Sequence, residues 1–213
     1  MHRRSRALVL VVWRLAEHLE EPGERTLFIL LADIPSRMLA TIRSRCQHWA
    51  LGIPDRAQSL AWLNETLGEG QDGDFWLRVA GGLPLLAVEL AGGEARGLRQ
   101  DLQELFDSLV RGGEPIAEAA RLDRQAVERI LWYGIAWLED LIRLGLSGDI
   151  DQLRNPDLLP LYRQAVKNAR LRDWFRLLDY AREQQRLLIA GGNPNPQLVL
   201  EAWLVRWSAL LRS

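Results

Sequence analysis

The stretch Ile130-Leu131-Trp132-Tyr133-Gly134-Ile135-Ala136-Trp137-Leu138 is too apolar for one side of a surface helix, and it predicts a helix buried on several sides. The segments around it have helical periodicity and are separated by glycine, asparagine and proline, at 145–151, 155–156 and 191–196. Residues 95–213 therefore predict a helical bundle, with a first helix over 95–111, stopped by Gly112-Gly113, and further helices over 115–121, 123–146, 157–169, 171–190 and 196–212.

A smaller helical unit is expected before the bundle, over residues 53–94. Its first helix, 54–67, is predicted to begin with Pro54 in the first turn. A second helix, 74–80, should be closed by Gly81-Gly82, and a third, 84–91, by Gly92-Gly93. The pattern predicts a compact three-helix unit.

Residues 1–52 have a different character. A helix over 7–19 should end at Glu20-Glu21-Pro22-Gly23. Thr26-Leu27-Phe28-Ile29-Leu30-Leu31 is a short apolar run of the kind found in strands buried in parallel sheets, and a weaker strand is expected over 48–51. The fold class predicted is mostly α, with a remnant of an α/β core that holds one or two strands.

Composition narrows the class of protein. The 213 residues are 48% hydrophobic and 26% charged, which fits an ordinary folded protein. The net charge of −1 indicates no overall electrostatic attraction to nucleic acid or to an anionic membrane. One cysteine, Cys46, excludes an internal disulfide, and the three histidines lack ligand spacing, so no metal site is expected. The apolar run 7–13 is too short for a membrane span and lacks a cleavage site, so we expect a cytoplasmic protein.

Three segments resemble the delta-prime family of bacterial DNA polymerase III clamp-loader subunits, members of the AAA+ superfamily. The first contains Leu19–Pro22, the run 27–31, and 34–47 with its Ser44-Arg45-Cys46 motif; the others are 77–87 and 193–207. The resemblance implies a truncated AAA+ core at 1–52, a helical lid at 53–94 and an oligomerisation collar at 95–213. The family's strands with the phosphate-binding loop and the magnesium-binding acid have no counterpart in residues 1–213.

The resemblance also implies a role for the motif. Arg45 matches the family's arginine finger, which reaches an ATP held by the neighbouring subunit; such a finger contributes on the order of 10³–10⁵ in rate. Arginine suits this role because its planar fork stays charged and grips phosphate oxygens with two donors. Ser44 is expected to cap or orient the turn, and Cys46 to pack as a small buried group. The plainer alternative is that Arg45 pairs with a surface acid.

Several features indicate that the chain holds no ATP of its own. It contains no Gly-x-x-x-x-Gly-Lys-[Ser/Thr] sequence. By the resemblance, Ala32 stands at the first-sensor position and is followed by Asp33, whose negative charge would repel phosphate. The resemblance also places apolar Leu85 or Leu86 where active relatives have a second-sensor arginine. No cofactor is therefore expected on this chain, and ATP and magnesium belong to the neighbouring subunit.

The resemblance implies partners as well: the gamma/tau and delta subunits, with the sliding clamp and primed DNA reached through the complex, and no membrane. The expected function is that of a non-hydrolysing clamp-loader subunit. One alternative is a helical adaptor or degenerate fragment that binds these subunits through the collar without supporting hydrolysis. Another is an independent ATPase.

Other candidate residues have plainer interpretations. Glu20 and Glu21 are adjacent and point to different sides of a helix end, so a solvated surface is favoured over an acid/base pair. The tryptophans favour core or interface packing over base stacking, because Trp132, Trp137, Trp174, Trp203 and Trp207 lie among leucines at helical spacing. Acidic neighbours dilute a basic run, which favours a solvated or interfacial face: Arg163, Lys167, Arg170, Arg172 and Arg176.

Overall fold

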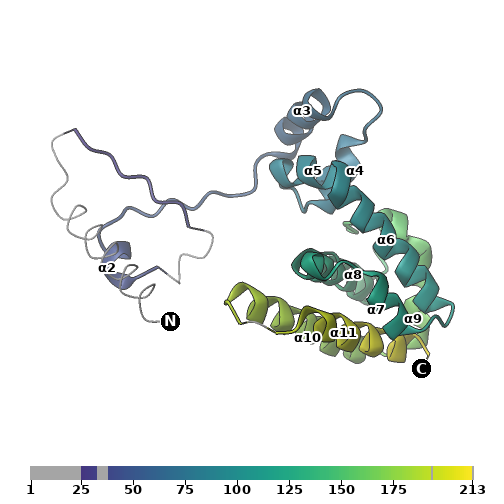
Figure 1. Ribbon diagram of the computed structural model, residues 1–213. Coiled ribbons are helices and arrows are strands. Elements are labelled where there is room, and N and C mark those ends of the chain that lie inside the picture. Colours follow the sequence, from purple (N-terminus) through teal and green to yellow (C-terminus); the bar gives the residue numbers. More distant parts are fainter. Residues whose placement is uncertain (1–24, 33–37, 193, 213) are drawn as a thin grey trace. The chain divides into compact units, whose positions relative to one another are not determined.

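The computed structural model describes residues 25–32, 38–192 and 194–212 (Figure 1). The chain forms two compact units, residues 1–52 and 53–213, so the predicted lid and collar lie within one unit. The helix predicted over 7–19 and the pair Glu20-Glu21 lie outside the described residues.

In the first unit, the described residues contain one short helix, α2 (Ala40–Arg43). The strand predicted over 26–31 and the weaker one over 48–51 are not formed: both segments are extended chain without a ladder, and Leu31 is 86% exposed. The reason is that a parallel strand is stable only when neighbouring strands satisfy its backbone groups, and the described residues supply none. The α/β part of the predicted fold class is therefore not seen here.

In the second unit, the regular elements formed by the described residues are all helices, as predicted. Its elements are α3 (Arg56–Leu67), α4 (Gly73–Val79), α5 (Pro84–Ala91), α6 (Gly93–Val110), α7 (Pro115–Arg121), the 3₁₀ turn η2 (Arg124–Ala126), α8 (Val127–Ser147), the 3₁₀ turn η3 (Pro156–Leu158), α9 (Leu159–Asn168), α10 (Leu171–Ile189) and α11 (Pro196–Leu211).

Local sequence explains where these helices begin. Asp55 caps α3 by accepting from the N–H groups of Ala57 at 2.9 Å and Gln58 at 3.1 Å. Pro54 therefore precedes the cap instead of lying in the first turn, which corrects the prediction. Asp72 caps α4, and Asn195 caps α11 just ahead of Pro196.

Glycines decide two of the helix ends. After α4, Gly81 and Gly82 have φ values of 65° and 88°, and the Gly82 N–H donates back to the Leu77 carbonyl at 2.9 Å. Gly92 alone separates α5 from α6. Gly93 already belongs to α6, so it does not close α5 as predicted.

The predicted helix 123–146 is divided into η2 and α8. Asp123 caps the 3₁₀ turn by accepting a hydrogen bond from the Gln125 N–H at 2.9 Å.

The bundle core is aromatic at its centre. Phe106 of α6 has its ring centroid 4.9 Å from that of Trp137 on α8, and 5.7 Å and 4.3 Å from those of Trp203 and Trp207 on α11. Trp174 of α10 completes the cluster, 5.7 Å from Trp207. These tryptophans are buried, so the prediction that they form core is confirmed for them, while Trp132 is half-buried.

α8 packs along α10, and α11 packs against α7 and α10 (Figure 1). The contact between α8 and α11 is close because position 134 is glycine: a Cβ there would lie 2.2 Å from Cζ2 of Trp203. The small helices α3, α4 and α5 pack on one another, and α5 continues into α6. The predicted three-helix unit is thus present.

Candidate functional site and a polar anchor between lid and bundle

The Ser44-Arg45-Cys46 motif forms the turn that follows α2. Ser44 is the C-cap; its N–H donates to the Ala40 carbonyl at 2.9 Å and its Oγ to the Thr41 carbonyl at 3.2 Å. Nη1 of Arg45 donates to the same Thr41 carbonyl at 2.8 Å. The turn therefore gathers two side-chain donors on one carbonyl at the end of α2, where helix carbonyls have no partner within the helix.

Arg45 is exposed, and so is Ser44, while Cys46 is half-buried with a free thiol. Cys46 is thus less buried than the sequence suggested. Ile42 is the buried residue of α2, so the helix turns one apolar side chain inward and presents the motif outward. The geometry holds a guanidinium at the surface, at the end of a helix.

At the positions that the resemblance assigns to the two sensors, the described residues are apolar. Ala32 is exposed and lies in the extended segment, whereas Asp33 lies outside the described residues. Leu85 is exposed and Leu86 half-buried, both in the first turn of α5. Within the described part of the chain, no cluster of three metal-ligating side chains occurs.

A second polar site, which was not predicted from sequence, surrounds a buried carboxylate in α8. Asp140 is completely buried and accepts hydrogen bonds from the backbone N–H of Arg154 at 2.9 Å and from that of Asn155 at 2.8 Å. It also accepts from Nδ2 of Asn155 at 3.0 Å and from Nη1 of Arg143 at 3.0 Å. A charged residue inside an otherwise apolar helix face was the signal for this site, because such residues are buried only when they are paired.

The segment held by Asp140 also contacts the small helical unit. Nη2 of Arg154 donates to the Val79 carbonyl at 2.9 Å, and Nη2 of Arg78 donates to the Asp151 carbonyl at 2.6 Å. The Arg154 guanidinium lies over the ring of Trp132, 5.4 Å from its centroid. The loop between α8 and η3 thus fastens α4 to the bundle by reciprocal bonds.

A second buried cation supports the same loop. Arg99 of α6, only 4% exposed, donates to Oδ1 of Asn155 at 3.1 Å and to Oδ1 of Asp157 at 2.9 Å. Its guanidinium also lies 5.1 Å from the ring centroid of Phe75. Buried charges of this kind are tolerated because each is paired and hydrogen-bonded.

The basic run of the bundle is exposed, which fits the predicted solvated or interfacial face. Its five cationic residues are exposed, and Arg172 and Arg176 both pair with Asp173, at 3.7 Å and 3.2 Å. Among the described residues, no helix is both long and apolar enough to cross a bilayer.

These features define the structural class of the protein. It is a multi-helix bundle with an aromatic core, to which a polar loop fastens a smaller helical unit. Two family models match the chain: "DNA polymerase III, delta subunit, C terminal" over residues 97–209, and "DNA polymerase III, delta subunit" over residues 14–54. The chain belongs to the DNA polymerase III delta-subunit family.

Individual relatives agree with this assignment. A Pseudomonas aeruginosa protein named DNA polymerase III subunit delta' is 28% identical over 201 residues, which are 92% of this chain and 61% of the relative. Its Yersinia pestis namesake is 29% identical, over 92% of this chain and 59% of the relative. Another from Haemophilus influenzae is 32% identical over 63% of this chain and 42% of the relative. The chain spans about three fifths of the first two relatives.

Proposed function

We propose that this chain acts as a non-hydrolysing subunit of a DNA polymerase III clamp loader, and that Arg45 serves as an arginine finger for an ATP bound by a neighbouring subunit. The observation that carries the proposal is the position of Arg45: an exposed guanidinium at the end of α2, in a Ser44-Arg45-Cys46 turn. Membership of the delta-subunit family supports it.

The chemistry requires a fixed cation supplied from outside the ATP site. Negative charge on the γ-phosphoryl oxygens is neutralised in the transition state, and an arginine held in place contributes most because it stays charged and offers two donors. The hydrogen bond from Arg45 to the Thr41 carbonyl limits the positions of the side chain before any neighbour binds. ATP and magnesium are assigned to the neighbour, so this chain supplies charge and position.

Under this proposal the bundle at 95–213 joins the gamma/tau and delta subunits, and the assembly, located in the cytoplasm, loads the sliding clamp on primed DNA. The buried anchor at Asp140 supports a role of this kind. It connects the loop that holds α4 to the bundle, so the small helical unit is held in a fixed relation to the surface that binds partners.

The test is an ATPase assay on the complex reconstituted from this chain and the gamma/tau and delta subunits of the same organism. Arg45→Ala should lower hydrolysis at the one affected site by about 10³-fold, seen as a lost fast phase in a single turnover with clamp and primed DNA. Arg43→Ala is the matched control, because Arg43 is exposed, two residues away, and carries the same charge. Assembly, measured by gel filtration, should be unchanged in both variants.

A second candidate function, a helical adaptor, is favoured by one observation. The apolar segment 26–31 has no strand pairing among the described residues, so the sheet that the resemblance implies for this unit is not seen in that part of the chain. Normal assembly with ATP hydrolysis that ignores Arg45→Ala would support the adaptor and reject the finger. ATP binding by the isolated chain would instead support an independent ATPase.

A further inference from the structure

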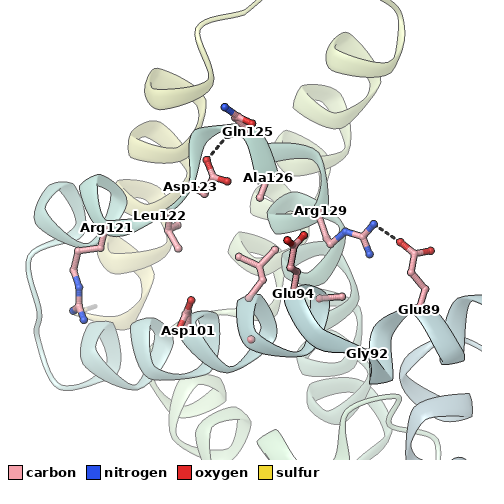
Figure 2. Close-up of a pocket in the computed structure, with 13 residues that line it drawn as sticks. Glu89, Gly92, Glu94, Asp101, Arg121, Leu122, Asp123, Gln125, Ala126 and Arg129 are labelled. Atoms are coloured by element: carbon pink, nitrogen blue, oxygen red, sulfur yellow. Dashed lines mark hydrogen bonds and ion pairs between the residues drawn. The ribbon is translucent and has the colours of Figure 1, made fainter. Parts of the chain in front are cut away.

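A groove of about 840 Å³ lies between α6 and the segment that joins α7 to α8 (Figure 2). Glu94, Leu98 and Asp101 of α6 form one wall, and Leu122 and Asp123 contribute to the other. The end near α5 is bounded by an ion pair between Glu89 and Arg129. No step of the proposed function uses this groove.

The charge of the groove is unbalanced. Four carboxylates and two guanidinium groups line it, which leaves an excess of two negative charges. Both guanidinium groups are already paired. Arg129 pairs with Glu89, and Arg121 pairs at 3.0 Å with Glu118, a residue outside the groove lining. The carboxylates of Glu94 and Asp101 have no hydrogen bond or ion pair within the described ranges. Both residues are exposed on the same face of α6, about two turns or about 10 Å apart along the helix.

A glycine in the middle of α6 is a second and independent observation. Gly97 lies between the two carboxylates and lines the groove, and a Cβ built there would meet nothing within 4 Å. Glycine inside a helix costs about 0.5–1 kcal/mol relative to alanine, and the packing of the described residues does not require it here, because the space around position 97 is open. What glycine provides at this position is bare helix backbone, which allows another chain to approach closely.

We propose that this groove binds an extended basic segment of a partner protein. Two lysine or arginine side chains of that segment pair with Glu94 and Asp101, and its backbone crosses α6 at Gly97. The half-apolar lining, with Leu98 and Leu122, accommodates the aliphatic stems of such side chains. Nucleic acid is excluded from this surface, because its phosphates would meet unpaired carboxylates.

The proposal is tested with the full 213-residue chain and two labelled nonapeptides, one alternating arginine with serine and one with glutamate in place of arginine. Fluorescence anisotropy should show binding of the arginine peptide and none of the glutamate peptide. The double variant Glu94→Gln with Asp101→Asn should weaken the arginine peptide at least fivefold. The matched control is Glu104→Gln with Asp179→Asn, which removes the same charge from two exposed carboxylates outside the groove and should change affinity less than twofold.

A variant that keeps all charges separates the groove from general attraction between acid and base. Gly97→Leu fills the groove and improves helix propensity, so it should abolish binding while raising Tm. Gly93→Leu is its control, since Gly93 lies on the same helix in open space and does not line the groove. Unchanged binding in Gly97→Leu, or equal losses in the two carboxylate double variants, would overturn the proposal and show adventitious charge attraction only.

Discussion

Asp140 accepts two hydrogen bonds from Asn155, one from the backbone N–H at 2.8 Å and one from Nδ2 at 3.0 Å, and both side chains are buried. Tyr162 approaches the same carboxylate with its hydroxyl at 3.4 Å. One carboxylate on α8 thus determines the course of the loop that leads to η3. Since that loop also holds α4, the stability of the second unit depends strongly on this one residue.

Replacement of Asp140 by asparagine should lower the free energy of unfolding by about 3 kcal/mol. The asparagine amide would place an N–H group against donors that now meet an oxygen, and it would remove the charge that balances Arg143. Urea denaturation followed by tryptophan fluorescence measures the change. Asp179→Asn, at an exposed position of α10, is the control and should stay within about 0.5 kcal/mol of wild type. A loss below 1 kcal/mol in Asp140→Asn would mean that the loop is held by its other contacts.

Gly134→Ala should destabilise the chain even though alanine is the better helix former. The added Cβ would lie 2.2 Å from Cζ2 of Trp203, and the buried indole has no space to withdraw into. Overpacking of this kind costs about 1–3 kcal/mol, which exceeds the gain in helix propensity of about 1 kcal/mol. Thermal unfolding should show a lower Tm, whereas Gly97→Ala, in open space, should raise it. A higher Tm for Gly134→Ala would show that α8 and α11 can move apart freely.

The order of the helices in the second unit could be predicted from sequence because several helices carry local start and stop signals. Asp72, Pro84, Pro115 and Asn195 mark helix starts, and Gly81-Gly82 marks an end. These signals act within a few residues, so no knowledge of packing is required. The predicted ends of α10 and α11 differ from the observed ones by a single residue.

What could not be predicted depends on contacts between distant residues. Apart from Arg143 on the same helix, the partners of Asp140 come from fourteen to twenty-two residues further along the chain. The groove wall facing Glu94 and Asp101 comes from the segment after α7. The strand over 26–31 was mispredicted because its apolar run describes an environment, a buried sheet, that the described residues do not contain. Arg45 was found by its motif alone, since one exposed arginine carries no signal of its own.

Arg154→Ala should release α4 locally. The substitution removes the donor to the Val79 carbonyl and the cation over Trp132, while the bundle core stays intact. Hydrogen exchange should become about fivefold faster for the amides of α4, as expected for loss of about 1 kcal/mol. Arg163→Ala, at an exposed position on α9, should leave these amides unchanged. Equal exchange in the Arg154 variant and wild type would assign the attachment of α4 to the Arg78 bond with Asp151.

Alkaline pH should weaken the fold through two buried tyrosines. Burial raises the pKa of Tyr133 from 10.0 to about 12, and its hydroxyl donates to the Ala95 carbonyl at 3.1 Å. Burial first, and then the charge of Asp140, raises the pKa of Tyr162 well above 10.0. An unfolded chain releases these protons near pH 10, whereas the folded chain retains them, so the stabilisation is complete below pH 10 and is lost as pH rises through the folded pKa values.

The expected slope is a loss of up to about 1.4 kcal/mol per pH unit for each tyrosine, beginning near pH 10 and ending for Tyr133 near pH 12. Urea unfolding at a series of pH values from 8 to 12 measures it. Tyr133→Phe should lower the free energy of unfolding by about 1 kcal/mol at pH 8, because the hydrogen bond to the Ala95 carbonyl is lost. Above pH 10 it should remove the contribution of one tyrosine from the fall of that free energy with pH. Tyr162→Phe should flatten it again, because the two hydroxyls have different hydrogen-bond partners, the Ala95 carbonyl and Asp140. If either variant kept the wild-type slope, that hydroxyl would have to ionise equally in the folded and unfolded chain, and its burial would not control the response to alkali.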